Sequence, residues 1–254
     1  MNDARVLTEV DDALLRVTIN RPEKRNALSL GLLDDIGAAF KQHRNSELKC
    51  AVITGAGDRA FAAGGDLKEL DALRTRAEAR AMSSRVHQVL DEIRYFPVPV
   101  IGALNGVALG GGAELAMACD IRIGAAHADL GLIQSQLALT TAWGGGIDLV
   151  NAVGNSAALA ILCSGRRLTA DEAMGMRLYE AVCPEGTDFA AFTADFVAAY
   201  LSKSINILRG YKATAAVRRR MLHEELDDIA RDAFVTAWVD DDHWAAAEKA
   251  LSKK

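Results

Sequence analysis

The stretch GVALGGGAELA at residues 106–116 decides the fold prediction. The apolar run at residues 98–104 reads as a buried strand that leads into it, and residues 113–118 read as a short apolar helix. Glycine at such a strand-to-helix junction permits unusual backbone dihedrals and a close approach of the backbone to a ligand. The free amides there lie at the positive end of a helix dipole, so we expect them to hold a negatively charged oxygen.

A second glycine-rich stretch, AFAAGGDL at residues 60–67, follows another buried-type strand at residues 49–54. Two backbone amides aimed at one point form an oxyanion hole. Two other interpretations exist. The glycines can simply close tight turns, and GAGDRA at residues 55–60 fits the dinucleotide fingerprint G-x-G-x-x-A. That fingerprint requires a helix to begin at once, whereas two more glycines follow, so we disfavour it.

Glu114 is the only carboxylate in the apolar stretch Val107–Cys119. Burying an unpaired charge is costly, so a glutamate on the core side of a short helix needs an explanation. Burial would raise its pKa and suit it to proton transfer. The alternative is a structural ion pair inside the core, with Arg122 as the partner.

The composition is that of a globular protein, since 50% of the 254 residues are hydrophobic and 25% are charged. The formal net charge of −5 gives no electrostatic reason to expect a nucleic-acid partner. The start of the chain lacks a charged-then-apolar signal pattern, and no apolar run is expected to span a bilayer. We therefore expect a cytoplasmic protein without a membrane partner.

Strand and helix patterns alternate over the first two-thirds of the chain, and the last third is almost wholly helical in pattern. This order predicts one α/β core followed by a helical extension. The four cysteines have neither CxxC nor Cys/His ligand spacing, which predicts buried free thiols and no metal site. They are Cys50, Cys119, Cys163 and Cys183.

With these stretches in place, the chain resembles the crotonase (enoyl-CoA hydratase/isomerase) superfamily. NRPEKRNALS at residues 20–29 is similar to its N-terminal signature, and the two glycine-rich stretches are similar to its two oxyanion loops. The resemblance implies a crotonase-type spiral of repeated ββα units over residues 1–195. It also implies a helical trimerisation region over residues 196–254 and assembly as a homotrimer or a dimer of trimers.

The resemblance further implies an acyl-CoA substrate whose thioester carbonyl oxygen lies between the amides of Gly65 and Gly111. No cofactor is expected beyond the coenzyme A moiety of that substrate. Lys24 and Arg25 suit the phosphates by charge, although two solvated surface cations would have the same sequence. The residues expected to bind the substrate through the two segments nearest the coenzyme are Lys24, Arg25, Ala27, Leu28, Ala63, Gly64, Asp66 and Leu67.

Two departures from the family pattern affect the chemistry. Hydratases of this family use a second glutamate in a G-x-P-E segment, and GLIQ at residues 131–134 puts Gln134 in its place. Glutamine cannot serve as a general acid or base at neutral pH. Glu114 and Gln134 are nevertheless the candidate catalytic residues. Trp143, in TTAWGGG at residues 140–146, resembles a subgroup that decarboxylates malonyl-type thioesters, and it either binds substrate or merely packs.

Three functional classes follow from the resemblance. The first expectation is a lyase of the enoyl-CoA hydratase/isomerase type that works through a stabilised thioester enolate. The alternative is a decarboxylase of a malonyl-type thioester, methylmalonyl-CoA or ethylmalonyl-CoA, because decarboxylation needs no base to begin. A non-catalytic acyl-CoA-binding protein is the third class.

Overall fold

The computed structural model describes residues 4–251, which form two sheets surrounded by helices. The larger sheet has the strand order β1-β2-β3-β5-β7-β9 and the smaller sheet the order β4-β6-β8. The strands are β1 (Val6–Asp11), β2 (Leu14–Ile19), β3 (Cys50–Gly55), β4 (Ala60–Ala62), β5 (Val100–Leu104), β6 (Val107–Leu109), β7 (Ile121–Ala125), β8 (Leu130–Gly131) and β9 (Ala181–Cys183). The α-helices are α1 (Leu30–His43), α2 (Leu67–Leu70), α3 (Arg76–Arg94), α4 (Gly111–Ala118), α5 (Gly145–Ser164), α6 (Ala170–Gly175), α7 (Phe189–Leu201), α8 (Ile205–Trp238) and α9 (Asp241–Leu251). Two short 3₁₀ helices, η1 (Pro22–Lys24) and η2 (Gln134–Leu137), complete the order.

A ββα unit repeats along the chain, as predicted. In the pairs β3-β4, β5-β6 and β7-β8 the first strand joins the larger sheet and the second joins the smaller one, and a helix follows. Apart from the antiparallel pair β1·β2, all paired strands are parallel. Parallel strands are covered on both faces, and every residue of β5 is accordingly buried. The spiral α/β class is therefore confirmed.

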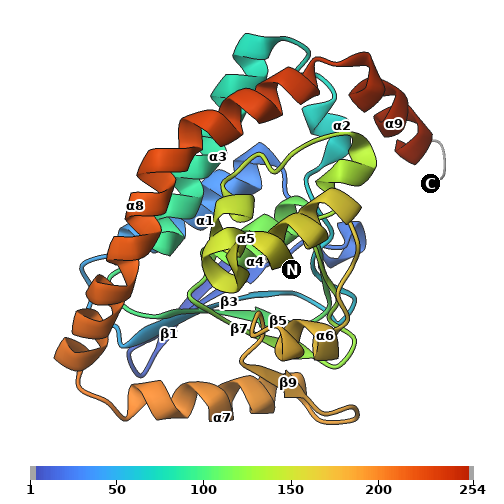
Figure 1. The fold of residues 1–254 in the computed structure, drawn as a ribbon. Helices are drawn as coiled ribbons and strands as arrows, with labels where there is room; N and C mark the ends of the chain where they lie inside the picture. Colours follow the sequence, from blue (N-terminus) through green and yellow to red (C-terminus); the bar gives the residue numbers. More distant parts are fainter. Residues whose placement is uncertain (1–3, 252–254) are drawn as a thin grey trace.

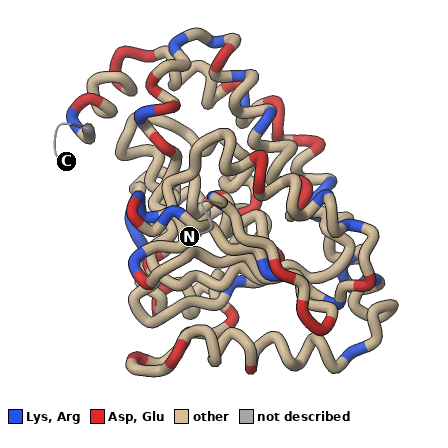
Figure 2. The backbone as a smooth tube through the Cα atoms, turned by 180° about the vertical axis from the view of Figure 1, so that it is seen from behind, with Lys and Arg blue, Asp and Glu red and all other residues tan. Residues whose placement is uncertain are grey.

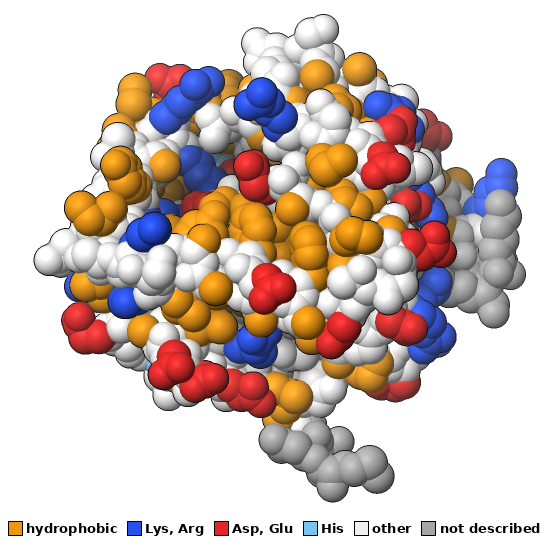
Figure 3. Space-filling model, turned by 90° about the horizontal axis from the view of Figure 1, so that it is seen from below, with side chains coloured by type: hydrophobic (Ala, Val, Ile, Leu, Met, Phe, Trp, Pro, Cys, Tyr) orange, Lys and Arg blue, Asp and Glu red, His pale blue; other side chains and the backbone are white. Residues whose placement is uncertain are grey.

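The helices divide between the two faces of the larger sheet. Helices α4 and α5 lie above it, α7 crosses its lower face, and α8 runs diagonally beside α3 (Figure 1). The main core fills the space above the larger sheet, and a smaller apolar cluster lies between that sheet and α7. Figure 3 shows the lower face of the molecule, where hydrophobic side chains gather across the middle.

The expected boundary between core and C-terminal region does not coincide with a structural break. Helix α7 spans Phe189–Leu201 and so crosses residues 195 and 196. The following helix, α8, packs back on α3 and α5 of the same chain. The C-terminal helices therefore complete the core of this domain.

Helix α5 corrects two sequence expectations. Its length and composition would suffice to cross a membrane, with a mean hydropathy of 1.5, so the expectation that no apolar run is long enough is wrong by that measure. Its first turns are buried, including the charged Asp148, whereas in its second half only Ala158 and Ile161 are buried. The C-terminal half is largely exposed, and Cys163 is therefore exposed rather than buried, unlike the other three cysteines.

The alternative dinucleotide fingerprint at residues 55–60 is also wrong. A fingerprint glycine turn leads into a helix, but here Ala60 begins the strand β4. The glycine turn after β3 therefore connects the two sheets and opens no helix.

A buried group of charges joins three helices. The Asp148 carboxylate in α5 accepts hydrogen bonds from Arg94 Nε of α3 at 3.0 Å and from Arg219 Nε of α8 at 2.7 Å. His223 Nε2, also on α8, lies 3.0 Å from the same carboxylate. These contacts lower the pKa of Asp148 well below its usual value despite its burial. Elsewhere acidic and basic residues are interspersed along the backbone, including the length of α8 (Figure 2).

We predict that Asp148→Asn destabilises the fold by about 3–5 kcal/mol, because it removes the buried charge that two buried guanidinium groups share. Denaturant unfolding of the variant and the parent protein measures the difference. Asp232→Asn is the matched control, because Asp232 pairs with Arg80 on the surface and should change stability by less than about 1 kcal/mol. Equal losses from both variants would contradict the structural role of Asp148.

Candidate active site

The two glycine-rich loops lie side by side, because their strands β4 and β6 pair in parallel. A Cβ added at Gly112 would lie only 1.9 Å from the carbonyl oxygen of Ala62, so the second loop packs directly on the first. Gly64 has φ of 117° and Gly110 has φ of 53°, a region that side chains rarely adopt. The sequence thus places glycine where the backbone turn and the close approach require it.

The amides of Gly65 and Gly111 are available to a ligand. Leu28 and Gly65 form a parallel β-bridge. In this bridge the amide of Leu28 donates to the carbonyl of Gly64, and the amide of Asp66 donates to the carbonyl of Leu28. The amide of Gly65 takes no part in it. Gly111 is the first residue of α4, where an amide has no partner within the helix. Among residues 4–251 neither amide donates a hydrogen bond to the protein. Their role as the oxyanion hole stays a prediction.

The predicted coenzyme-binding residues lie together around this loop. The amide of Leu28 donates to the carbonyl of Gly64 at 2.9 Å, and the amide of Ala63 donates to the carbonyl of Arg25 at 3.0 Å. Asp66 forms an ion pair with Arg21, whose guanidinium also donates to the carbonyl of Ala27. Leu67 follows as the first residue of α2.

Two cations at the edge of this segment make no side-chain hydrogen bond or ion pair within residues 4–251. Lys24 and Arg25 are both exposed, and Arg25 has a left-handed φ of 50°. The sequence analysis missed the buried Asn26 beside them. Its amide nitrogen donates to the carbonyls of Ala56 and Ala60, which ties this segment to the turn after β3.

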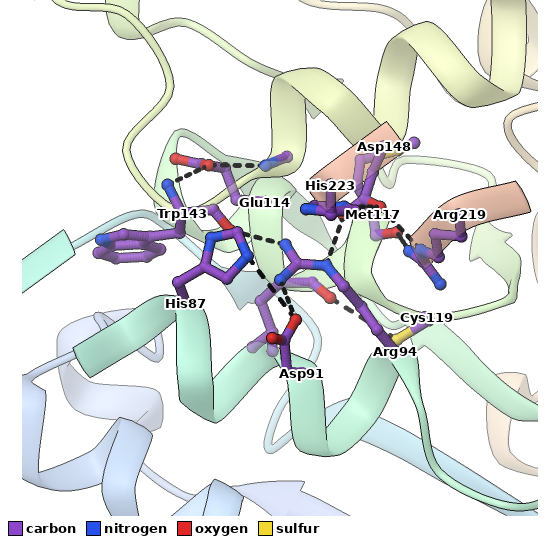
Figure 4. Close-up of polar contacts among 12 residues, drawn as sticks. His87, Asp91, Arg94, Glu114, Met117, Cys119, Trp143, Asp148, Arg219 and His223 are labelled. Carbon is purple, nitrogen blue, oxygen red and sulfur yellow. Dashed lines mark hydrogen bonds and ion pairs between the residues drawn. The ribbon is translucent and has the colours of Figure 1, made fainter. Parts of the chain in front are cut away.

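Glu114 is almost completely buried, and its carboxylate accepts four hydrogen bonds. Oε1 accepts from Gln134 Nε2 at 2.9 Å and from the amide of Ala142 at 3.1 Å. Oε2 accepts from the amides of Trp143 at 2.8 Å and Gly145 at 2.9 Å. Gly145 is the first residue of α5, so the carboxylate sits at the positive end of that helix. Figure 4 shows the Glu114 carboxylate beside the main chain of Trp143.

The geometry fits an ionised Glu114. Burial raises the pKa of this carboxyl group above its usual value, and the four hydrogen bonds offset only part of that rise. Three of the donors are main-chain N–H groups, which cannot accept a proton from a carboxylic acid. Protonation of either oxygen would turn a hydrogen bond into a contact between two donors. The suggested ion pair with Arg122 is wrong, because that guanidinium donates to the carbonyls of Leu178 and Cys119 instead.

Gln134, where the family has its second glutamate, contacts Glu114 directly through its amide nitrogen. Its Oε1 atom is buried and has no hydrogen-bond partner in the described part of the chain. The structure therefore brings the two predicted catalytic residues together. It gives Gln134 an unused acceptor and gives Glu114 no unused one.

Trp143 lies beside Gly65 and Gly111, the two glycines predicted to form the oxyanion hole. A Cβ added at Gly111 would lie 2.2 Å from its Cζ3 atom, and one added at Gly65 would lie 3.7 Å from its Cη2 atom. The indole is buried, and its Nε1 donates to the sulfur of Met82 at 3.3 Å. The side chain is thus part of the core and of the site wall together.

The buried charges behind the site hold the Trp143 backbone. Arg94, fully buried, donates from Nη2 to the carbonyl of Trp143 at 2.6 Å while its Nε binds Asp148 (Figure 4). His87 and His223 both lie against the Cα of Gly144. The loop that supplies three amides to Glu114 is therefore fixed from the opposite side by α3 and α8.

His87, His223 and Asp227 resemble a metal-ligand group, since their ligand atoms lie within 4.8 Å of one another. Tetrahedral zinc, with bonds of about 2.0–2.1 Å, separates its ligand atoms by about 3.3 Å. Here His223 Nδ1 instead forms a hydrogen bond with Asp227 Oδ1 at 3.0 Å, and His87 Nε2 lies 3.0 Å from the other carboxylate oxygen. Burial lowers the pKa of His223, but its contacts with Asp148 and Asp227 outweigh this and leave the pKa above its usual value.

A cavity of about 670 Å³ lies beside α7, away from these residues. It is lined by the ends of β3, β5 and β7 and by the loop before α7, and none of the predicted site residues borders it. The charged side chains that line the cavity are one arginine, Arg16, and three acidic residues, Asp58, Glu185 and Asp188. The cavity thus adds no group to the candidate site.

Comparison with known proteins agrees with this geometry. Residues 9–242 match the enoyl-CoA hydratase/isomerase family profile. The chain belongs to the enoyl-CoA hydratase/isomerase family. It is 39% identical over 185 residues to the Bacillus subtilis protein YngF, whose name carries the same family designation, across 72% of this chain and 70% of that protein. It is 35% identical over 178 residues to the short-chain-enoyl-CoA hydratase of Clostridium acetobutylicum, across 70% and 68% of the two chains.

Solved structures of the same family share the whole fold. An enoyl-CoA hydratase/isomerase from Mycobacterium paratuberculosis superposes with a TM-score of 0.88 at 26% identity, and the match covers 96% of this chain and 98% of that one. An enoyl-CoA hydratase from Bacillus anthracis gives a TM-score of 0.80 at 28% identity, with 99% and 97% covered. The crotonase resemblance is confirmed, including the C-terminal helices.

Sequence reasoning missed the residues that support the site. Asp148 is a lone carboxylate in an apolar run, the same signal that singled out Glu114, and could have been found in that way. Its partners Arg219 and His223 lie 71 and 75 residues further along the chain. No local pattern connects residues at that separation.

We predict that Glu114→Gln lowers the free energy of unfolding by about 2–4 kcal/mol, because the new amide group faces main-chain donors at the start of α5. Denaturant unfolding checks the size of the loss. Glu47→Gln, at an exposed surface carboxylate, is the control and should stay within about 0.5 kcal/mol of the parent. A parent-like stability for Glu114→Gln would mean that the carboxylate does not hold the helix start.

Proposed function

We propose that this protein is an acyl-CoA lyase that forms a thioester enolate between the amides of Gly65 and Gly111. The family assignment supports acyl-CoA processing, and the two unbonded amides support an oxyanion hole. Exposed Lys24 and Arg25 would meet the coenzyme phosphates. No protein group needs to supply redox or Lewis-acid chemistry for this step.

The reaction that the site supports best is decarboxylation of a 2-alkylmalonyl thioester such as methylmalonyl-CoA or ethylmalonyl-CoA. One observation carries this choice: all four acceptor positions of Glu114 are occupied, and its side-chain neighbour is Gln134. Addition of water to an enoyl thioester needs a general base and a general acid. Glu114 is held as a helix cap, and Gln134 carries an amide. Neither residue readily acts as a general base or a general acid.

Decarboxylation makes smaller demands on these residues. The bond between the substrate carboxylate and Cα breaks, and carbon dioxide leaves. The electron pair of that bond stays on Cα and delocalises into the thioester carbonyl as an enolate. The amides of Gly65 and Gly111 stabilise the negative oxygen, which is typically worth about 10²–10³ in rate for each donor. A proton from solvent water then adds to Cα and gives the saturated acyl-CoA.

Hydration of an enoyl-CoA is the second candidate. It is favoured by the relatives, among them the Clostridium protein named as a short-chain-enoyl-CoA hydratase. Glu114 also stands at the position of one hydratase glutamate. In this case Glu114 would have to exchange one of its main-chain hydrogen bonds for a water molecule during turnover.

Assembly as a homotrimer or a dimer of trimers stays a prediction, as does a cytoplasmic location. Helix α8 carries an exposed apolar stripe that a neighbouring subunit could cover, formed by Ile207, Tyr211, Val217, Met221 and Ile229. Such a stripe is unusual on a monomer. Mass photometry should give three or six copies of the chain, and a monomer at micromolar concentration would contradict this assembly.

A substrate panel tests the proposed reaction. We expect the purified protein to release carbon dioxide from methylmalonyl-CoA or ethylmalonyl-CoA faster than it hydrates crotonyl-CoA, as measured by mass spectrometry. Gln134→Glu should raise the hydration rate by at least about tenfold and lower decarboxylation, because it restores a second carboxyl group beside Glu114.

Gln136→Glu is the matched control, since Gln136 lies in the same 3₁₀ helix but donates to the carbonyl of Gly165. It should leave the ratio of the two reactions unchanged. Faster hydration than decarboxylation by the parent protein would establish the second candidate instead.

A further inference from the structure

The position of the Trp143 indole carries an inference about which acyl groups the site accepts. It rests on the proposed function, in that the thioester carbonyl must lie at Gly65 and Gly111. The Cζ3 and Cη2 atoms of the ring would be 2.2 Å and 2.5 Å from a Cβ at Gly111. Cη2 would be 3.7 Å from a Cβ at Gly65. The outer edge of one ring therefore touches both residues that would hold the carbonyl oxygen.

A second side chain closes the same space. Leu70 Cδ1 would lie 2.8 Å from a Cβ at Gly65, and Leu70 is itself buried. Glycine at both positions is thus required by its neighbours as well as by the ligand. Apolar atoms of Trp143 and Leu70 thus lie beside the two glycines that would hold the thioester carbonyl.

Trp143 is fixed at each of its polar groups, in the main chain as well as in the indole. Its amide donates to Glu114 Oε2 at 2.8 Å, its carbonyl accepts from Arg94 Nη2 at 2.6 Å, and its Nε1 donates to Met82 Sδ at 3.3 Å. Arg94 is in turn held by Asp148 and by Asp91, which lies 3.0 Å from its Nη1. Rotation of the ring out of the site would break the Met82 contact and open a void in a packed core.

We propose that Trp143 sets the upper size of the acyl group, so that this site takes short-chain acyl thioesters and excludes long-chain ones. A short group fits between the carbonyl position and the ring edge. A long chain would have to displace a buried indole that the Met82 contact and the surrounding core hold in place. Trp143 is therefore a specificity-determining residue that requires no part in bond breaking.

Binding of saturated thioesters tests this proposal separately from the reaction, because butyryl-CoA and dodecanoyl-CoA are neither decarboxylated nor hydrated. Isothermal titration calorimetry should show that the parent protein binds butyryl-CoA more tightly. In Trp143→Ala the affinity for dodecanoyl-CoA relative to butyryl-CoA should rise by at least about tenfold, as several methylenes gain a buried position. Trp143→Leu keeps more of the core volume and should show a smaller shift in the same direction.

Trp238→Phe is the matched control. Trp238, the last residue of α8, is about as buried as Trp143, but its indole donates to the carbonyl of Leu73. It should lower stability without changing the affinity ratio. The proposal is overturned if folded Trp143→Leu and Trp143→Ala keep the parent's ratio, or if the parent binds both thioesters equally. A protein that selects by chain length but turns over no malonyl thioester would retain this inference and lose the proposed reaction.

Discussion

The arrangement of this site depends on one carboxylate at the start of one helix. Glu114, on α4, accepts hydrogen bonds from the amides of Ala142, Trp143 and Gly145 where α5 begins. A buried anion at this point compensates for amides that would otherwise have no partner, and it benefits from the helix dipole. With the hydrogen bond from Gln134, these contacts stabilise the buried charge and occupy all four acceptor positions of the carboxylate. Glu114 therefore has no free position for proton transfer in the ground state.

From this contact the other parts of the site take their positions. The loop that binds Glu114 carries Trp143, whose ring then lies beside Gly65 and Gly111. Arg94 holds the far side of that loop through the Trp143 carbonyl, and Asp148 holds Arg94. Charged groups of α3, α5 and α8 thus act on the acyl site without touching it. The C-terminal helices contribute to this arrangement from within the same chain.

Much of the fold and part of the site could be predicted from the sequence. The glycine-rich stretches at residues 60–67 and 106–116 predicted two loops that lie side by side, because glycine is needed where the backbone turns with positive φ. The isolation of Glu114 in an apolar run predicted its importance, but its role as a helix cap could not be predicted. Its partners lie 28 to 31 residues further along the chain, in a loop whose path only the packing of α4 against α5 determines.

Errors in the sequence analysis have physical reasons of the same kind. Arg122 seemed a suitable partner for Glu114 because it lies close in sequence and carries the opposite charge, yet strand β7 turns it toward main-chain carbonyls. Cys163 lies in an apolar run but on the exposed half of α5. Side-chain direction within a helix or strand therefore limits such predictions more than residue type does.

The ionisation state of Glu114 is the most direct test of this account. Carbon-13 NMR of protein labelled at the glutamate carboxyl carbons, titrated from mildly acidic to mildly alkaline pH, follows this group separately from the exposed glutamates. We expect Glu114 to give the chemical shift of a carboxylate at neutral pH, because every neighbour of its oxygens is a donor. A signal from a protonated carboxyl group at neutral pH would contradict the helix-cap role and restore Glu114 as a proton donor.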